Sequence, residues 1–212
     1  MPIALFCRKL GTTQIFTDDG ECIPVTILEA GRNSVVQKKT LEKDGYTALQ
    51  LSFGERRASQ TTRPLAGHFR KANAAPARRL AESRVTPEEA LAHEVGESIT
   101  VSIFDKGQRV DVIGISKGRG TAGVVKRHNM AVMRRTHGTH EATRHGGAIG
   151  AGSYPGRVLK GMKMPGRMGN SQVTSLNVEV VEVDADRSLL FVRGSVPGHL
   201  NGIVRVRPTV HG

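Results

Sequence analysis

Several residue types that define other classes of protein are scarce in this sequence. Of 212 residues, 4% are aromatic and none is Trp, so recognition by stacking bases on many aromatic rings is excluded. Cys7 and Cys22 are too few for a disulfide framework and lack metal-ligand spacing, so we expect two buried thiols in a reducing compartment. No apolar run reaches membrane-spanning length, and the segment from Met1 onward has no signal-peptide features. These absences favour a cytoplasmic protein without a membrane partner.

Acidic residues are almost absent from one long stretch. Residues 117–169 contain eleven Lys or Arg against the single acid Glu141, together with twelve Gly and one aromatic residue, Tyr154. The stretch therefore carries +10 of the chain's net charge of +12. Glycine offers no packing surface and crowded cations cannot be buried unpaired, so no compact core can form here. Such charge on a pliable backbone points to a phosphate polymer as partner.

A second stretch, residues 56–79, has seven basic residues and no acid. Outside the two stretches, 13 basic residues face 18 acidic ones, so the remainder is mildly acidic. The positive charge is thus concentrated rather than spread over the whole surface. A concentration of this kind is typical of a binding face for nucleic acid.

The rest of the chain predicts a mainly β fold. Apolar residues alternate with polar ones, and Gly or Asp turns separate the runs. The ranges with this pattern are 23–28, 35–36, 46–51, 99–103, 110–115, 178–183, 189–193 and 203–206. Many short strands joined by turns favour a barrel or a sandwich. One short helix is expected at about 87–95, because Thr86 can cap it, Pro87 suits its first turn and Gly96 suits its end.

The pattern predicts two parts. Residues 1–116 and 170–212 form a β-barrel body that includes the basic segment 56–79 and the short helix. Residues 117–169 form an extended loop inserted between two strands. We expect the isolated loop to be disordered without RNA, because it cannot bury enough apolar surface to offset its chain entropy.

Two glycine patterns invite a nucleotide-binding interpretation. Residues 118–123 match G-x-G-x-x-G after a predicted strand. The surrounding strands are hairpin-connected, however, and no helix followed by a parallel strand is expected. Residues 156–161 resemble the start of a phosphate-binding loop, but Met162 stands where that loop requires Lys. We therefore expect no nucleotide cofactor, no small-molecule substrate and no enzymatic activity.

Histidines within the basic stretch raise the question of a metal site. The Arg-rich surroundings would repel a divalent cation, so we expect no metal and assign His137 and His140 to RNA contacts instead. Glu141 has no paired carboxylate or nucleophile beside it, so we expect it to pair with a nearby Arg. Composition alone leaves open a duplex-DNA architectural protein, which would also be basic and glycine-flexible.

Two long motifs carry a further signal. Residues 116–128, SKGRGTAGVVKRH, and residues 155–170, PGRVLKGMKMPGRMGN, resemble the ribosomal protein L3 family of the large ribosomal subunit. Shorter matches to the same family lie at residues 9–16, 23–26, 67–69 and 136–138. The resemblance spans nearly the whole chain, and its length is similar to that of bacterial members.

The resemblance implies a β-barrel body on the outside of the large subunit, bound to ribosomal RNA. It also implies a loop that reaches toward the peptidyl transferase region, binding early in subunit assembly, and contacts with neighbouring large-subunit proteins. Some relatives carry a Gln methylated on its side-chain amide where this chain has Ser153, so that modification is expected to be absent. Some carry Trp where this chain has His128, a smaller ring with hydrogen-bonding nitrogens.

The candidate RNA contacts follow from charge and motif together. In the loop they are Lys117, Arg119, Lys126, Arg127, His128, Arg134, Arg135, His137, His140, Arg144, Arg157, Lys160, Lys163 and Arg167. A second contact face near the body is formed by Arg56, Arg57, Arg63, His68, Arg70 and Lys71. We expect neutralisation of phosphates and fit of shape, with little reading of base edges, because amide and planar side chains are few in the loop.

Overall fold

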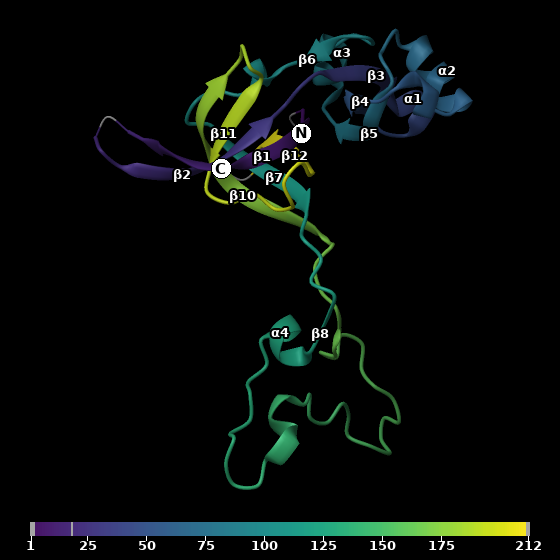
Figure 1. Ribbon diagram of the computed structural model, residues 1–212. Coiled ribbons are helices and arrows are strands. Elements are labelled where there is room, and N and C mark those ends of the chain that lie inside the picture. Colours follow the sequence, from purple (N-terminus) through teal and green to yellow (C-terminus); the bar gives the residue numbers. More distant parts are fainter. Residues whose placement is uncertain (1–2, 18, 211–212) are drawn as a thin grey trace. The chain divides into compact units, whose positions relative to one another are not determined.

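The computed structural model describes residues 3–17 and 19–210 (Figure 1). Met1 and Pro2 of the segment considered for a signal peptide therefore lie outside the described residues. The chain forms two compact units, which we call the body, residues 1–115 and 172–212, and the basic loop, Ser116–Ser171. The predicted mainly β class is confirmed, since strands far outnumber the few short helices.

Six strands of the body pair antiparallel in a closed order. They are β1 (Leu5–Phe16), β12 (Ile203–Pro208), β7 (Arg109–Ile115), β10 (Gln172–Asp184), β11 (Leu189–Arg193) and β2 (Cys22–Glu29), and β2 pairs back with β1. The basic loop leaves at the end of β7 and returns at the start of β10. These two strands are themselves paired, with Ile115 opposite Gln172. The body therefore fixes both ends of the loop at one position.

The remaining strands of the body form a four-stranded sheet. Its order is β5 (Ala77–Arg84), β4 (Ala48–Glu55), β3 (Asn33–Lys39) and β6 (Ser98–Ile99). The short helices of the body are α1 (Leu41–Asp44), α2 (Arg63–Lys71) and α3 (Pro87–Ala92), with 3-10 turns at Ala58–Gln60 and Val101–Ile103. One apolar cluster joins Leu5, Leu28 and Leu190 of the closed sheet to Leu49 and Leu51 of the four-stranded sheet. Both sheets thus share a single core.

Most predicted strands are present, but one is wrong and one boundary shifts. The range 99–103 is not a strand, because β6 ends at Ile99 and Val101–Ile103 form a 3-10 turn that buries Val101. The strand expected at 46–51 begins at Ala48 and continues to Glu55. The short helix is confirmed over Pro87–Ala92, although it ends three residues before the predicted limit at residue 95.

The basic segment 56–79 contains ordered elements that its sequence did not predict. Helix α2 spans Arg63–Lys71 with Pro64 in its first turn, and β5 begins at Ala77. The buried Phe69 anchors the helix, packing with Val36 and Ala72.

The prediction of two buried thiols is right for Cys7 and wrong for Cys22, which is exposed on β2. Among the described residues, no helix is both long and apolar enough to cross a membrane.

Candidate nucleic-acid interface

The two limbs of the basic loop are held together where they leave the body. The Ser116 N–H donates to the Ser171 carbonyl at 2.9 Å, and the Arg119 N–H donates to the Met168 carbonyl at 2.9 Å. Just beyond, β8 (Thr121–Ala122) pairs antiparallel with β9 (Gly166–Arg167). We call these paired residues, 116–122 and 166–171, the stem. The stem gives the loop a defined base even though its sequence carries no strand pattern.

The glycine pattern at residues 118–123 leads into a short helix. Helix α4 spans Val124–His128, and the Arg127 N–H donates to the Gly123 carbonyl at 2.9 Å. The helix has five residues and ends at Asn129, whose backbone is left-handed. Every strand pairing among the described residues is antiparallel. The parallel βαβ unit that holds a dinucleotide is therefore absent from that part of the chain.

Two of the predicted RNA contacts also brace the loop internally. Arg127 Nη1 donates to the Met164 carbonyl oxygen at 2.8 Å, and His128 Nε2 lies 3.0 Å from the same oxygen. A Cβ at Gly166 would stand 2.7 Å from Arg127 Nη1, so a side chain at this position would displace the Arg127 guanidinium from its contact. These contacts tie α4 to the returning limb. Arg127 uses one of its five N–H groups in this way, so the others remain for an external acceptor.

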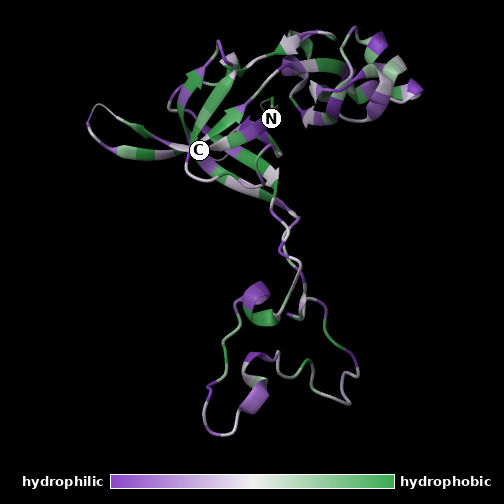
Figure 2. Ribbon diagram, in the orientation of Figure 1, coloured by the Kyte–Doolittle hydropathy of each residue, from purple (hydrophilic) through white to green (hydrophobic). Residues whose placement is uncertain are grey.

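Almost nothing in the basic loop is buried. Within residues 116–171, all of them described, only Ala122 and Val124 are buried, and all eleven Lys and Arg side chains are exposed. In Figure 2 the strands of the body alternate between hydrophobic and hydrophilic residues, whereas most of the loop has intermediate hydropathy with hydrophilic residues at its helical turns. No ion pair forms within this range. The expected pairing of Glu141 with a nearby Arg is therefore wrong, and the cations of the loop have no protein counter-charge within it.

A hollow of about 490 Å³ lies in the middle of the loop, lined by residues 135–140 and Thr143. His137 and His140 both have left-handed backbones, with φ of 59° and 46°. The Thr139 hydroxyl donates to the Thr136 carbonyl at 3.0 Å and closes the turn between them. Both imidazoles are exposed at this site. In the described part of the chain, no group of three or more His, Cys, Asp or Glu is placed to hold a metal ion.

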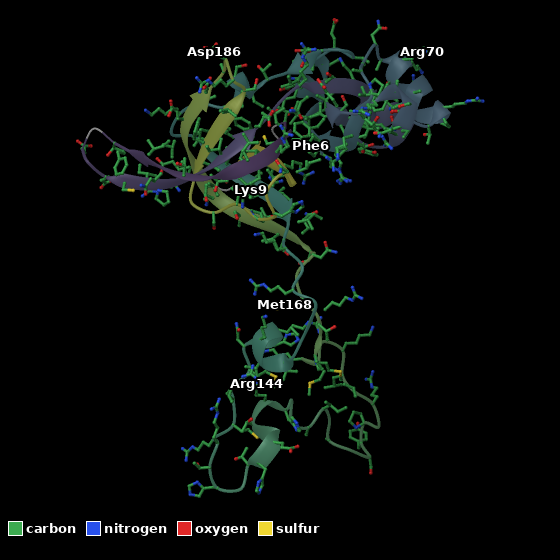
Figure 3. The ribbon with its side chains drawn as sticks, viewed as in Figure 1. Phe6, Lys9, Arg70, Arg144, Met168 and Asp186 are labelled. Carbon is green, nitrogen blue, oxygen red and sulfur yellow. The ribbon has the colours of Figure 1, made fainter. Side chains whose placement is uncertain are left out.

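The second predicted face lies on and just before α2. Arg56, Arg57, Arg63, Arg70 and Lys71 are all exposed, and Arg70 and Arg144 mark the two basic regions in Figure 3. His68 differs from them, because it is half-buried and its Nε2 lies 2.6 Å from Gln50 Oε1. The structure therefore gives His68 a role in fixing α2 to β4.

Sequence reasoning missed two arginines on β12. In this strand Val204 and Val206 face the core, while Arg205 and Arg207 alternate with them. This alternation was the available signal, since it places both guanidinium groups on one side of the strand. They lie outside both basic stretches, which is why an argument from charge density overlooked them.

Comparison with known proteins identifies the relatives of this chain. A model of the family "Ribosomal protein L3" matches residues 89–188. The large ribosomal subunit protein uL3 of Thioalkalivibrio sulfidiphilus (strain HL-EbGR7) is 50% identical over 210 residues, covering 99% of this chain and 98% of the relative. The uL3 proteins of Azoarcus sp. (strain BH72) and Myxococcus xanthus (strain DK1622) are each 48% identical, covering 99% and 97% of this chain and 99% and 92% of theirs.

Identity at this level over whole chains settles the family. Members are structural proteins of the large ribosomal subunit that take part in translation in the cytoplasmic ribosome, and they are not enzymes. The chain belongs to the ribosomal protein L3 family.

Proposed function

We propose that the protein binds large-subunit ribosomal RNA directly, chiefly through the basic loop. The observation that carries this proposal is the state of the eleven Lys and Arg side chains in residues 116–171, all exposed and none in an ion pair there. A folded segment with this much unneutralised charge repels itself. RNA phosphates would supply the missing anions, and their bound counterions would be released to solution.

The backbone of the loop suits the same partner. Glycines such as Gly120, Gly138 and Gly161 have positive φ and open space where a Cβ would stand. Backbone N–H groups at such positions can approach a phosphate closely. The loop has few amide side chains that could read base edges, so positioning by phosphate and sugar contacts dominates. The exposed Arg56, Arg57, Arg63, Arg70 and Lys71 would add a second set of phosphate contacts.

The placement of the protein in the subunit is also part of this proposal. Its closed six-stranded sheet would serve as a β-barrel body on the outside of the subunit, beside other large-subunit proteins. The loop would run inward toward the peptidyl transferase region, since half of its length could span up to roughly 85 Å if fully extended. Binding early in subunit assembly would let RNA fold around the loop. Family membership supports each of these points.

The proposal is tested by titrating salt against binding of the whole protein to large-subunit ribosomal RNA. Unrelated RNA and duplex DNA of equal length serve as competitors. We expect a preference for the ribosomal RNA that persists as salt rises. Replacing Arg157, Lys160 and Lys163 by Gln should lower the slope of log affinity against log salt by about 2 to 3. The matched control replaces Lys43, Lys106 and Arg187 by Gln, which removes the same charge from exposed positions of the body and should change the slope little.

The same titration decides between ribosomal RNA and the architectural alternative. Equal affinities for all three nucleic acids, collapsing together as salt rises, would mean generic binding to polyanions and would contradict the proposal. Tight binding of duplex DNA at matched salt would favour a DNA architectural protein instead.

Omitting the protein from a reconstitution of the large subunit tests the assembly role. Without the protein, we expect early assembly intermediates to fail to form.

A further inference from the structure

A hollow in the body gathers three arginines from distant parts of the sequence. It has a volume of about 430 Å³ and lies between β12 and β5. The polar residues that line it are Tyr46, Glu82, Ser83, Arg84, Arg205 and Arg207. None of them belongs to the basic loop or to the second basic face. The volume is that of an ordinary small-ligand site, so a phosphate group with part of its sugar would fit.

The two acidic groups near the hollow each accept hydrogen bonds, but of the two only Asp111 is paired with a cation. Glu82 Oε2 accepts a hydrogen bond from the Tyr46 hydroxyl at 2.7 Å. Asp111 Oδ2 accepts from Arg207 Nη2 at 3.1 Å and from Arg207 Nε at 3.3 Å. Arg207 is therefore neutralised, and its planar guanidinium is held in place. Arg84 lies over the Tyr46 ring, with its Cζ 5.5 Å from the ring centroid.

Arg205 is the exception in this cluster. Its Nε is buried and is the single buried side-chain nitrogen or oxygen among the described residues without a hydrogen-bond partner. Arg205 also forms no ion pair in that part of the chain. Burial, and then repulsion from Arg207, lower the pKa of Arg205 below its ordinary value. A buried donor left without an acceptor is unfavourable, so the position is suited to an anion that supplies one.

The surroundings of Arg205 fix it in the sheet. It lies on β12 opposite Phe6 of β1, which is labelled in Figure 3, and opposite Ile113 of β7. The rim is also fixed, because the buried Ser83 hydroxyl accepts the Ala4 N–H at 2.9 Å. The backbones of Arg205 and Arg207 are thus carried on a rigid wall, and Asp111 also holds the guanidinium of Arg207. A planar fork held in this way matches the geometry of a phosphate group.

We infer that this hollow binds one phosphate group of the RNA backbone, with Arg205 as the main donor and Arg84 and Arg207 beside it. The inference rests on the proposed function, because RNA is the phosphate source to which it commits. It adds a contact on the body that is separate from the basic loop and from α2. Such a contact would fix the body on RNA at a defined position.

The test uses the whole protein and large-subunit ribosomal RNA. Arg205→Gln should weaken binding about tenfold, as expected for a hydrogen bond between charged groups, and should lower the salt slope by about 0.7. Arg187→Gln is the matched control, because it removes one charge from an exposed turn of the body. It should leave both quantities nearly unchanged. Arg205→Lys keeps the charge without the planar fork, so it should recover the slope more fully than the affinity.

A second measurement needs no folded variant. The side-chain Nε–H resonance of Arg205 in the wild-type protein should shift when inorganic phosphate is added, and should not shift with chloride at matched ionic strength. A shift with an acidic peptide but not with phosphate would indicate a protein partner and overturn the inference. An Arg205 resonance that does not shift with phosphate, together with an unchanged salt slope for Arg205→Gln, would also overturn the inference. If the wild-type protein shows no preference for ribosomal RNA, the proposed function itself fails, which is a separate result.

Discussion

Gly169 lies directly against the Lys117 carbonyl oxygen, so that a Cβ at Gly169 would stand 2.1 Å from that oxygen. The φ of Gly169 is +73°, a conformation that side chains other than glycine rarely adopt. The two residues lie on opposite limbs of the stem, next to the hydrogen bond from Arg119 to Met168. Closure of the stem therefore depends on a glycine at this position.

Gly169→Ala should open the stem. In the complex with RNA, where the loop is ordered, we expect the Arg119 and Met168 amides to exchange with solvent at least tenfold faster than in the wild type, because the methyl group and the Lys117 carbonyl oxygen cannot both keep their places. Gly161→Ala is the control, since Gly161 also has a positive φ of 83° but has no atom within 4 Å of its Cβ position. It should cost only about 1 kcal/mol of local strain. Equal exchange rates in the two variants would contradict the role of this contact.

The Asp111–Arg207 pair should be the costliest ion pair of the body to break. Asp111 is 2% exposed and also accepts the Asn177 N–H at 3.2 Å. Asp111→Ala leaves a half-buried guanidinium without its partner, so we expect a loss of about 3 kcal/mol in the free energy of unfolding, measured with urea. Glu29→Ala breaks the more exposed pair with Arg8 and should cost less than about 1 kcal/mol. Similar losses for both variants would refute this ranking.

Thr86 and Thr62 offer a matched test of helix capping. Both occupy the N-cap of a helix with Pro in the first turn, but only Thr86 forms a capping box, in which its hydroxyl accepts the Glu89 N–H. Thr86→Ala should lower the free energy of unfolding by about 1 kcal/mol, whereas Thr62→Ala should have a much smaller effect. Thermal unfolding of both variants checks this. The expectation fails if Thr62→Ala costs as much as Thr86→Ala.

The amino-acid pattern predicted those elements in which one face is buried and the other is polar. Val110 and Val112 of β7 and Val178 and Val180 of β10 are buried. In each strand they stand two residues apart, which is the alternation that the sequence showed. The same rule failed at Val101, whose burial comes from a 3-10 turn rather than from a strand. Helix α2 was missed because Pro64 and Gly67 interrupt its pattern and Phe69 is its only buried residue.

The residues of the candidate site could likewise be predicted only in part from the sequence. Charge counting located the eleven exposed cations of the loop, because exposure follows from a lack of apolar residues around them. It could not locate the contact of Arg127 with Met164, since the acceptor is a backbone carbonyl 37 residues away and any residue type would supply one. Nor could it locate the hollow at Arg205, which combines Tyr46 and Arg84 with a strand more than a hundred residues later.

The two cysteines should differ sharply in reactivity. Burial raises the pKa of Cys7 from 9.0 to about 12, so its reactive thiolate is scarce at neutral pH, whereas Cys22 is exposed. A thiol reagent at pH 8 should modify one cysteine in the native protein and two after denaturation. The folded state retains a proton that the unfolded chain releases above about pH 9. Cys7 therefore lowers the free energy of unfolding as pH rises from 9 to 12, by up to about 1.4 kcal/mol per pH unit.

Removing the thiol separates this effect from other titrations. Cys7→Ala should flatten the alkaline decline in stability, although the lost sulfur will lower stability at every pH. Cys22→Ala provides the control and should leave the slope as it is. Modification of both thiols in the native protein at equal rates would contradict the burial of Cys7.

The basic loop should become ordered only when RNA binds. Ala122 and Val124 are its only buried residues, which is too little apolar burial to offset the entropy of fixing more than fifty residues. In the free protein we expect amides of residues 117–169 to exchange rapidly and to give poorly dispersed resonances. Amides of Val180 and Leu190, in the core of the body, should stay protected throughout. Adding ribosomal RNA should slow exchange in the loop, because phosphates then neutralise its cations and hold its backbone. Sharp, dispersed resonances from residues 117–169 without RNA would show that the stem and α4 suffice to order the loop.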